Sequence, residues 1–355
     1  MIISKNYIHM KKHLFFILTV FVSVSVFFFS ACKKDPKNIC VNDIKLDIHS
    51  LSLEIGDTAR LTAIVYPDNA EDHTVTWTSS NPEVAIISND GLVTAVSCGE
   101  TMIVVTTEDG KKTDECIVFV FRSLRIVQWC DPQLGYQIDY ATCVAQAKRA
   151  VELINMLSPD LLLLCGDMIH DCENEQYVND FLEIISHVDV PMMLTPGNHD
   201  LPNPVTIEGL ERYRSLFGDD FQIKELKGYF IISLNSQLYY YPNNVPHEEY
   251  NRHVTRVNEA LQDAKSKNKP VIVMSHEIPL NMPDVHKYFI ENGAFLWLGG
   301  HWHIPWRYTY SYPFGSIITL VGETTGCNSD NSPLGIRLLT FHPDHSFDWD
   351  FVPLY

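Results

Sequence analysis

The sequence predicts a layered α/β domain preceded by a smaller all-β domain. Between residues 44 and 121, short alternating segments are separated by Pro, Asn, Asp and Gly turns, which is typical of a β-sandwich. From residue 124 onward, apolar runs of strand length alternate with amphipathic helical stretches, which indicates an α/β fold. A length of 355 residues accommodates about two domains, and 46% hydrophobic residues are enough for each to bury a core.

The N-terminus has the features of an export signal. Lys11 and Lys12 precede an apolar run over residues 14–29, and Ser30-Ala31-Cys32 follows. The run is shorter than the roughly 20 apolar residues of a bilayer-spanning helix. Small residues before a cysteine resemble a bacterial lipobox, in which Cys32 becomes the lipidated first residue; a plain signal peptide or an uncleaved anchor is the alternative. We expect residues 1–32 to direct export, residues 33–42 to form a linker, and the mature protein to be a lipoprotein of the bacterial cell envelope.

Residues 43–121 are expected to form the all-β domain, with strands over residues 59–66, 74–78 and 101–107. The stretch Val-Thr-Trp-Thr-Ser-Ser-Asn-Pro at residues 75–82 and the later run at residues 90–95 resemble the bacterial Ig-like group 2 domain. The resemblance implies a small Ig-like sandwich with Trp77 in its core. Such modules are often found in surface proteins, and we expect a spacer here, with adhesion as the alternative role.

Residues 123–355 are expected to form the layered α/β domain. Apolar runs predict strands over residues 124–129, 161–165, 192–195, 229–234, 271–274 and 295–298, with further strands over 317–321, 336–341 and 347–352. Amphipathic stretches predict helices over residues 141–157, 208–217 and 249–267.

Five motifs follow apolar runs of this domain. They are Asp131-Pro132-Gln133, Gly166-Asp167-Met168-Ile169-His170, Gly197-Asn198-His199-Asp200, Ser275-His276-Glu277 and Gly299-Gly300-His301-Trp302-His303. Ligand sites of α/β sheets form at the carboxyl ends of the strands, so loops that leave those ends meet at one edge. Carboxylate, amide and imidazole groups are ligands for divalent metals. Any one motif alone would be a capping Asp or a surface His, but together they predict a metal site.

The order and spelling of these motifs resemble the calcineurin-like metallophosphoesterase superfamily, whose pattern reads D-x-H, G-D-x-x-D, G-N-H-D/E, H and G-H-x-H. The resemblance covers residues 124–355. It implies a four-layer α/β/β/α sandwich that hydrolyses phosphate mono- or diesters with a hydroxide activated by two divalent metals (Mn, Fe, Zn or Mg). It also implies the roles of single residues: Asp167 bridges both metals, Asp131, Gln133 and His303 bind the first, Asn198, His276 and His301 bind the second, and His199 protonates the leaving group.

Two positions depart from the family pattern. Gln133 replaces a histidine; it is either an oxygen ligand that favours Mn²⁺ or Mg²⁺ over zinc, or it leaves its place to water. Asp-Pro-Gln-Leu-Gly nevertheless resembles the form that the first motif takes in one subgroup of the family. His170 replaces the carboxylate that usually orients the catalytic histidine, here His199. Either Asp171 or Asp200 takes over this role, or His199 is held more loosely. A surface binding or adhesion protein with a degenerate phosphoesterase scaffold is the alternative function.

Charge and cysteine content limit the partners. The formal net charge of −18 argues against nucleic acid and anionic membranes, because no basic stripe offsets it. We expect the substrate to be a phosphate ester, either a small molecule or a headgroup. The protein is expected to attach to the membrane through Cys32. No protein partner is evident from the sequence. Among the nine cysteines, Cys98 and Cys116 are candidates for a disulfide, whereas Cys130 and Cys165 are expected to be buried free thiols.

Overall fold

The computed structural model describes residues 39–136, 138–280, 282–326, 333–342 and 344–355. The chain divides into two compact units, the first ending at Phe121 and the second beginning at Arg122. The predicted export signal with Cys32, and residues 33–38 of the predicted linker, lie outside the described residues. Within the described ranges, no helix has the length and apolar character needed to cross a membrane.

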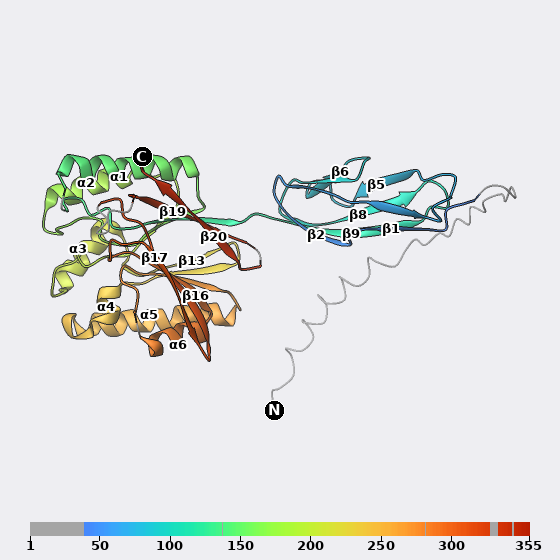
Figure 1. The fold of residues 1–355 in the computed structure, drawn as a ribbon. Coiled ribbons are helices and arrows are strands. Elements are labelled where there is room, and N and C mark those ends of the chain that lie inside the picture. The colour runs from blue at the N-terminus through green and yellow to red at the C-terminus, as the bar shows by residue number, and fades with distance from the viewer. Residues whose placement is uncertain (1–38, 137, 281, 327–332, 343) are drawn as a thin grey trace, which may run out of the picture. The chain divides into compact units, whose positions relative to one another are not determined.

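Every element described in the N-terminal unit is a β-strand, which confirms the predicted fold class (Figure 1). The strands form three sheets with the orders β1-β4, β2-β9-β8-β5 and β3-β7-β6. In β8 and β9, alternate residues such as Ile103, Val105 and Val118 are fully buried, as expected for strands with one face on a core. The bounds are β1 (Asp43–Leu46), β2 (Ser50–Glu54), β3 (Thr58–Arg60), β4 (Ala63–Tyr66), β5 (Val75–Ser79), β6 (Ala85–Ile87), β7 (Leu92–Ala95), β8 (Gly99–Thr107) and β9 (Thr113–Phe121).

Two expectations about this unit are wrong. The single strand predicted over residues 59–66 is interrupted at Leu61, because β3 pairs with β7 and β4 pairs with β1, so the chain passes from one sheet to another. The buried Leu61 marks the crossing, where its N–H donates to the Gly91 carbonyl at 2.9 Å. Cys98 and Cys116 are both free thiols rather than a disulfide.

The C-terminal unit contains two mixed sheets (Figure 1). One has the order β12-β11-β10-β19-β20, and the other β13-β14-β15-β16-β18-β17. The elements are β10 (Leu124–Trp129), α1 (Tyr140–Leu157), β11 (Leu161–Leu164), α2 (Glu175–Ile185), β12 (Met192–Leu194), α3 (Ile207–Phe217), β13 (Gln222–Leu226), β14 (Tyr229–Ser233), α4 (Ser236–Tyr240), the 3-10 turn η1 (Pro242–Asn244), α5 (His247–Ser266), β15 (Val271–Met274), α6 (Pro283–Glu291), β16 (Ala294–Gly299), β17 (Trp306–Tyr312), β18 (Gly315–Val321), β19 (Gly335–Phe341) and β20 (Phe347–Pro353).

Successive side chains of the central strands point to opposite faces of each sheet, and this alternation produces four layers. In β11, Leu162 packs in the cluster shared with α1 and α2, while Leu163 packs in the cluster between the two sheets. In β15, Val273 packs in the cluster shared with α5 and α6, while Ile272 points to the inter-sheet cluster. Strands buried on both faces read as continuous apolar runs, which explains their clear signal in the sequence. Helices on the outer face of each sheet complete the predicted α/β/β/α sandwich, and Figure 1 shows the two helical layers on opposite sides.

The sequence analysis missed edge strands and short helices of this unit. Strands β13 and β17 are edge strands whose side chains are mostly half-buried or exposed, so neither has an apolar run. Helices α2 and α6 are short, with 11 and 9 residues, and each buries only a few side chains. Periodicity over so few residues is a weak signal against the surrounding loops.

Two isoleucines test the importance of the inter-sheet core. Ile272→Ala empties a site with 0% exposure and is expected to lower the free energy of unfolding by about 2–5 kcal/mol. The matched Ile223→Ala removes a side chain that is 47% exposed on β13, and a change within about 1 kcal/mol is expected. Urea unfolding of both variants measures the difference, and equal losses would contradict the described packing.

Candidate metal centre

The five predicted motifs converge at one place, where carboxyl ends of strands from both sheets meet. Asp131, Asp167 and Asn198 follow β10, β11 and β12 of the first sheet. His276 and His301 follow β15 and β16 of the second. The two sets are joined directly, because the His301 main-chain N–H donates to the Asp131 carboxylate at 3.0 Å. Parallel strands in each sheet therefore deliver side chains from two layers to one site.

Asp167 belongs to both of two ligand groups. One group contains Asp131, Asp167 and His303, and the other contains Asp167, His276 and His301; within each, the ligand atoms lie within 4.8 Å of one another. The Asp167 Oδ2 atom is 3.3 Å from His276 Nε2. Two overlapping groups around one shared carboxylate are the arrangement needed to bring two divalent cations close together.

Asn198 completes the second group. Its Oδ1 atom lies 3.1 Å from His276 Nε2 and 2.9 Å from His301 Nδ1. The other ring nitrogen of His276, Nδ1, lies 2.9 Å from the Cys165 carbonyl oxygen, which can only accept. A proton is therefore fixed on Nδ1, and Nε2, which faces Asn198 and Asp167, is the atom that would bind a metal once its own proton is displaced. Such an outer hydrogen bond is the usual way to fix the tautomer of a ligating histidine.

Gln133 lies beside the first group. Its main-chain N–H donates to the Asp167 carbonyl at 2.9 Å, and its Nε2 atom is 3.4 Å from Asp167 Oδ2. Its Oε1 atom is buried and has no hydrogen-bond partner among the described residues. A buried amide oxygen without a partner is costly unless a cation or water occupies the space before it. The residues present therefore fit a metal ion, with Gln133 able to offer oxygen.

Backbone strain concentrates at this site. Ten non-glycine residues of the described chain have positive φ, and five of them are predicted ligands. Left-handed backbone is unfavourable for side chains with a Cβ, and where it persists the surrounding structure enforces it. The five ligands, with φ between 38° and 74°, are Asp131, Gln133, Asp167, His301 and His303.

Two motif glycines leave room for the carboxylates. A Cβ atom on Gly197 would lie 2.1 Å from Asp167 Oδ1, and one on Gly300 would lie 2.4 Å from Asp131 Oδ2. Real Cβ atoms essentially never approach so closely. The glycines of Gly-Asn-His-Asp and Gly-Gly-His-Trp-His are therefore required by close approach of the ligands from the neighbouring loops.

His199 is oriented by a main-chain carbonyl. Its Nδ1 atom lies 2.8 Å from the His170 carbonyl oxygen, and its main-chain N–H donates to Asp167 Oδ1 at 3.0 Å. Neither carboxylate considered from the sequence hydrogen-bonds this ring. Asp200 instead accepts from the main-chain N–H groups of Met168 and Gly197, at 2.9 and 2.8 Å, and fixes the loops.

Sequence reasoning missed Tyr136. Its ring centroid lies 5.2 Å from that of His303 and 5.1 Å from that of His170. The His170 ring in turn lies 4.7 Å from the His199 ring. These rings form an aromatic wall beside the first ligand group. The only sequence signal was the position of Tyr136, three residues after Gln133 in the same loop.

A hollow of about 270 Å³ adjoins the second ligand group. Its lining includes Asn198 and His301 together with Gln237, Tyr241 and Glu277. The tyrosines at residues 239–241 have different surroundings at this hollow. The Tyr239 ring packs near those of His253 and Phe289, whereas Tyr241 is exposed and lines the hollow.

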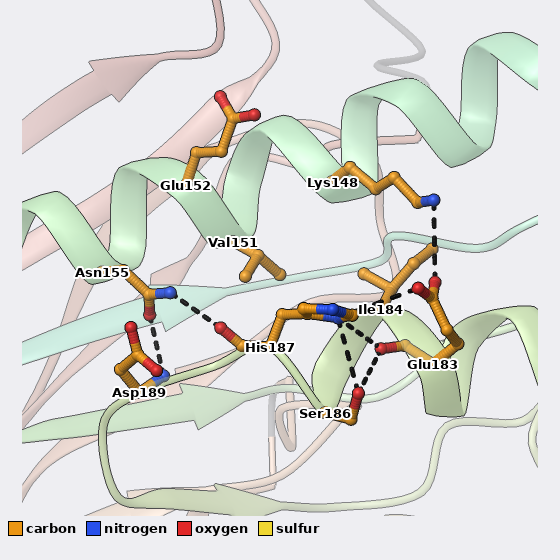
Figure 2. A pocket seen from close by; sticks show the side chains of 9 residues that line it. All are labelled: Lys148, Val151, Glu152, Asn155, Glu183, Ile184, Ser186, His187 and Asp189. Atoms are coloured by element: carbon orange, nitrogen blue, oxygen red, sulfur yellow. Dashed lines mark hydrogen bonds and ion pairs between the residues drawn. The ribbon is translucent and has the colours of Figure 1, made fainter.

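Figure 2 shows a different hollow, of about 530 Å³, between α1 and α2. Its polar groups are largely paired with one another: Asn155 donates to the His187 carbonyl at 2.7 Å, and Lys148 lies 3.6 Å from Glu183. No predicted ligand lines it. The chemistry of the site therefore belongs to the hollow beside the ligand groups and not to this one.

Two members of the ligand cluster, Asp131 and His276, hold protons more tightly than the same groups would in water. Burial raises the pKa of Asp131 to about 7; nearby His276 opposes the rise and Asp167 adds to it. Burial lowers the pKa of His276, but the carboxylates of Asp167 and Asp131 outweigh burial and raise it to about 10. The pKa of Asp167 is lowered, because His276 and His199 together outweigh burial. A cation that enters the cluster must therefore displace protons.

Metal binding is consequently expected to release protons and to strengthen with pH. As the pH rises through about 7, Asp131 loses its proton, so affinity increases by about ten-fold per pH unit for each proton displaced. Calorimetric titration with Mn²⁺ at about pH 6 and about pH 8, in buffers of different ionisation enthalpy, measures affinity and proton release. At about pH 6, where Asp131 is mostly protonated, the Asp131→Asn variant should release about one proton fewer. Affinity that is flat over this range would contradict the expectation.

Comparison with known proteins gives matches in both units. The family model described as calcineurin-like phosphoesterase matches residues 124–305, and that of the bacterial Ig-like domain (group 2) matches residues 40–118. Relatives include serine/threonine-protein phosphatase CPPED1 of Homo sapiens, 26% identical over 218 residues, covering 54% of this chain and 68% of the relative. The CPPED1 of Danio rerio is 27% identical over 266 residues, covering 62% of this chain and 84% of the relative.

Among solved structures, a dimetal phosphatase from Danio rerio is similar over 65% of this chain and 96% of its own length, with 12% identity and a TM-score of 0.47. The family match spans all five motifs. Together with the two ligand groups, it indicates divalent metal use and hydrolysis of phosphoester bonds. The chain belongs to the calcineurin-like phosphoesterase family, and an Ig-like domain precedes its catalytic unit.

Proposed function

We propose that the protein is an exported phosphoesterase that uses two divalent metals to hydrolyse phosphate mono- or diesters. The observation that carries this proposal is the Asp167 carboxylate shared by two ligand groups. Asp131, Gln133, Asp167 and His303 would hold the first cation, and Asp167, Asn198, His276 and His301 the second. When bound, two such cations lower the pKa of a water and offset the charge of phosphoryl oxygens.

The chain's own residues supply the proton for the leaving group. The His170 carbonyl can only accept, so the hydrogen on His199 Nδ1 is fixed and Nε2 is the atom that gains and loses a proton. The main-chain hydrogen bond to Asp167 sets the distance of His199 from the ligand groups. A histidine positioned in this way by its loop is suited to donate to a departing alkoxide oxygen.

Export and attachment are part of the same proposal, and their support is the sequence. The basic pair, apolar run and Ser-Ala-Cys that end at Cys32 would direct the protein to the cell envelope and anchor it by a lipid. The Ig-like unit would then act as a spacer between the anchor and the catalytic unit. A site outside the cytoplasm would meet small organic phosphates or headgroups, although the relatives are named as protein phosphatases.

The proposed chemistry is tested with p-nitrophenyl phosphate and its bis-ester in the presence of Mn²⁺. His199→Ala is expected to lower kcat/KM by about 10²–10⁴-fold, because the leaving group loses its proton donor. Asn198→Ala is expected to lower turnover and metal content together. His187→Ala, in the hollow of Figure 2, is the matched control and should leave both unchanged. Absence of metal-dependent turnover on either ester would favour a surface-binding protein with a degenerate scaffold.

The role of Gln133 has a separate test. Imidazole is a stronger ligand than an amide oxygen, so Gln133→His is expected to raise affinity for the first metal by about ten-fold and to shift preference toward zinc. Metal titration monitored by calorimetry measures the change. Gln222→His, on the edge strand β13, adds the same side chain away from the site. A titration of Gln133→His that matches the unmodified protein would show that Gln133 is not a ligand.

A further inference from the structure

The hollow beside the second ligand group carries a single carboxylate. Apart from His301, its lining residues are neutral except for Glu277, and no lysine or arginine is among them. Glu277 is half-buried, and none of the ion pairs between described residues includes it. A phosphate ester bound by cations at Asn198 and His301 would extend its organic part into a space whose fixed charge is negative.

Neutral donors hold this carboxylate in place. Gln237 Nε2 donates to Glu277 Oε1 at 2.7 Å, and the Tyr241 hydroxyl donates to Oε2. The Glu277 main-chain N–H donates to Ser236 Oγ at 3.2 Å. The two bonds to its oxygens orient the carboxylate, and neither donor carries a charge that would cancel its own. The side chain is thus already positioned before a substrate arrives, so little rotamer entropy is lost on binding.

An aromatic side chain accompanies the carboxylate. Tyr241 is 40% exposed and lines the same hollow, with its hydroxyl engaged by Glu277. Aromatic rings and carboxylates together attract organic cations, and quaternary ammonium groups in particular. The remaining wall combines apolar side chains with amides: Leu201, Pro202, Val205, Asn203 and Asn244. Such a wall suits the methylene and methyl groups of an amino alcohol.

We propose that Glu277 is a specificity-determining residue that selects phosphate esters of amino alcohols, in which a positively charged nitrogen follows the phosphate after a short carbon chain. The proposal rests on the phosphoesterase function proposed above. An organic part with a further negative charge would meet the Glu277 carboxylate and find no cationic side chain in the hollow, so it is disfavoured. Choline and ethanolamine esters have the required chemistry, both as free phosphates and as lipid headgroups.

The test compares choline phosphate with 3,3-dimethylbutyl phosphate, which has the same shape without the charge. In the Mn²⁺-loaded full-length protein, kcat/KM is expected to favour choline phosphate by at least about ten-fold, and Glu277→Gln is expected to reduce that ratio to about one. Glu183→Gln, in the hollow of Figure 2, is the matched control and should retain the ratio. Glycerophosphocholine presents the same choline group as a soluble diester, and phosphatidylcholine vesicles present it as a lipid headgroup. The compound with the highest kcat/KM identifies whether the substrate is a free phosphate ester or a lipid.

A binding measurement separates this proposal from the proposed chemistry. Calorimetric titration with choline and with 3,3-dimethylbutanol reports selectivity even if no ester is hydrolysed; tighter binding of choline that is lost in Glu277→Gln supports the proposal. Absence of turnover with that selectivity intact would refute only the phosphoesterase function. Equal kcat/KM for the charged and neutral esters, or a ratio unchanged in Glu277→Gln, would overturn the proposal. A Glu277→Gln variant that loses metal affinity and slows both esters equally would overturn it too, since Glu277 would then act on the metals.

Discussion

The Asp167 carboxylate is the constraint on which the catalytic unit depends. It lies in both ligand groups, accepts the main-chain N–H of His199, and lies 3.3 Å from His276 Nε2. The carboxylate is almost completely buried, so its charge must be balanced by nearby groups. In the described residues that balance comes from His276, which follows a strand of the second sheet, and from His199, which follows a strand of the first. The Asp167 carboxylate therefore couples the two sheets at their common edge, and the Asp131 carboxylate, which accepts from the His301 main-chain N–H, does the same.

The sandwich makes this arrangement possible. Apolar residues of β10, β11, β15 and β16 fill the space between the sheets, and the ligands occupy the loops that leave the same strands. Rigid strands thus set the positions of the loop ends, while strained left-handed backbone at Asp131, Asp167 and His301 turns the side chains toward one another. Tight packing stabilises the unit as a whole, and part of that stability offsets the local strain. Glycines at 197 and 300 permit the closest approaches.

Beyond the ligands, the site is asymmetric. The first ligand group is bordered by aromatic rings, with Tyr136, His170 and His199 in sequence. The second opens into a hollow with amides, a tyrosine and the Glu277 carboxylate. With the roles proposed above for His199 and Glu277, proton transfer and recognition of the organic group would take place on different sides of the centre. The departures at Gln133 and His170 both fall on the first side, where Gln133 presents a buried amide oxygen beside the ligand group and the main-chain carbonyl of His170 contacts the His199 ring.

The sequence alone predicted the fold class, the positions of the central strands and the residues that the structure brings together in two candidate ligand groups, because strands buried on both faces produce uninterrupted apolar runs and each motif follows one of them. The sequence did not reveal edge strands β13 and β17, because their side chains are only partly buried, nor helices α2 and α6, because their periodicity extends over only 11 and 9 residues. Only the tertiary structure decided what orients His199, because a main-chain carbonyl has no signature in sequence. It also decided what Tyr136 and Glu277 contact: both are close in sequence to predicted ligands, but the contacts of their side chains depend on packing between loops that are distant along the chain.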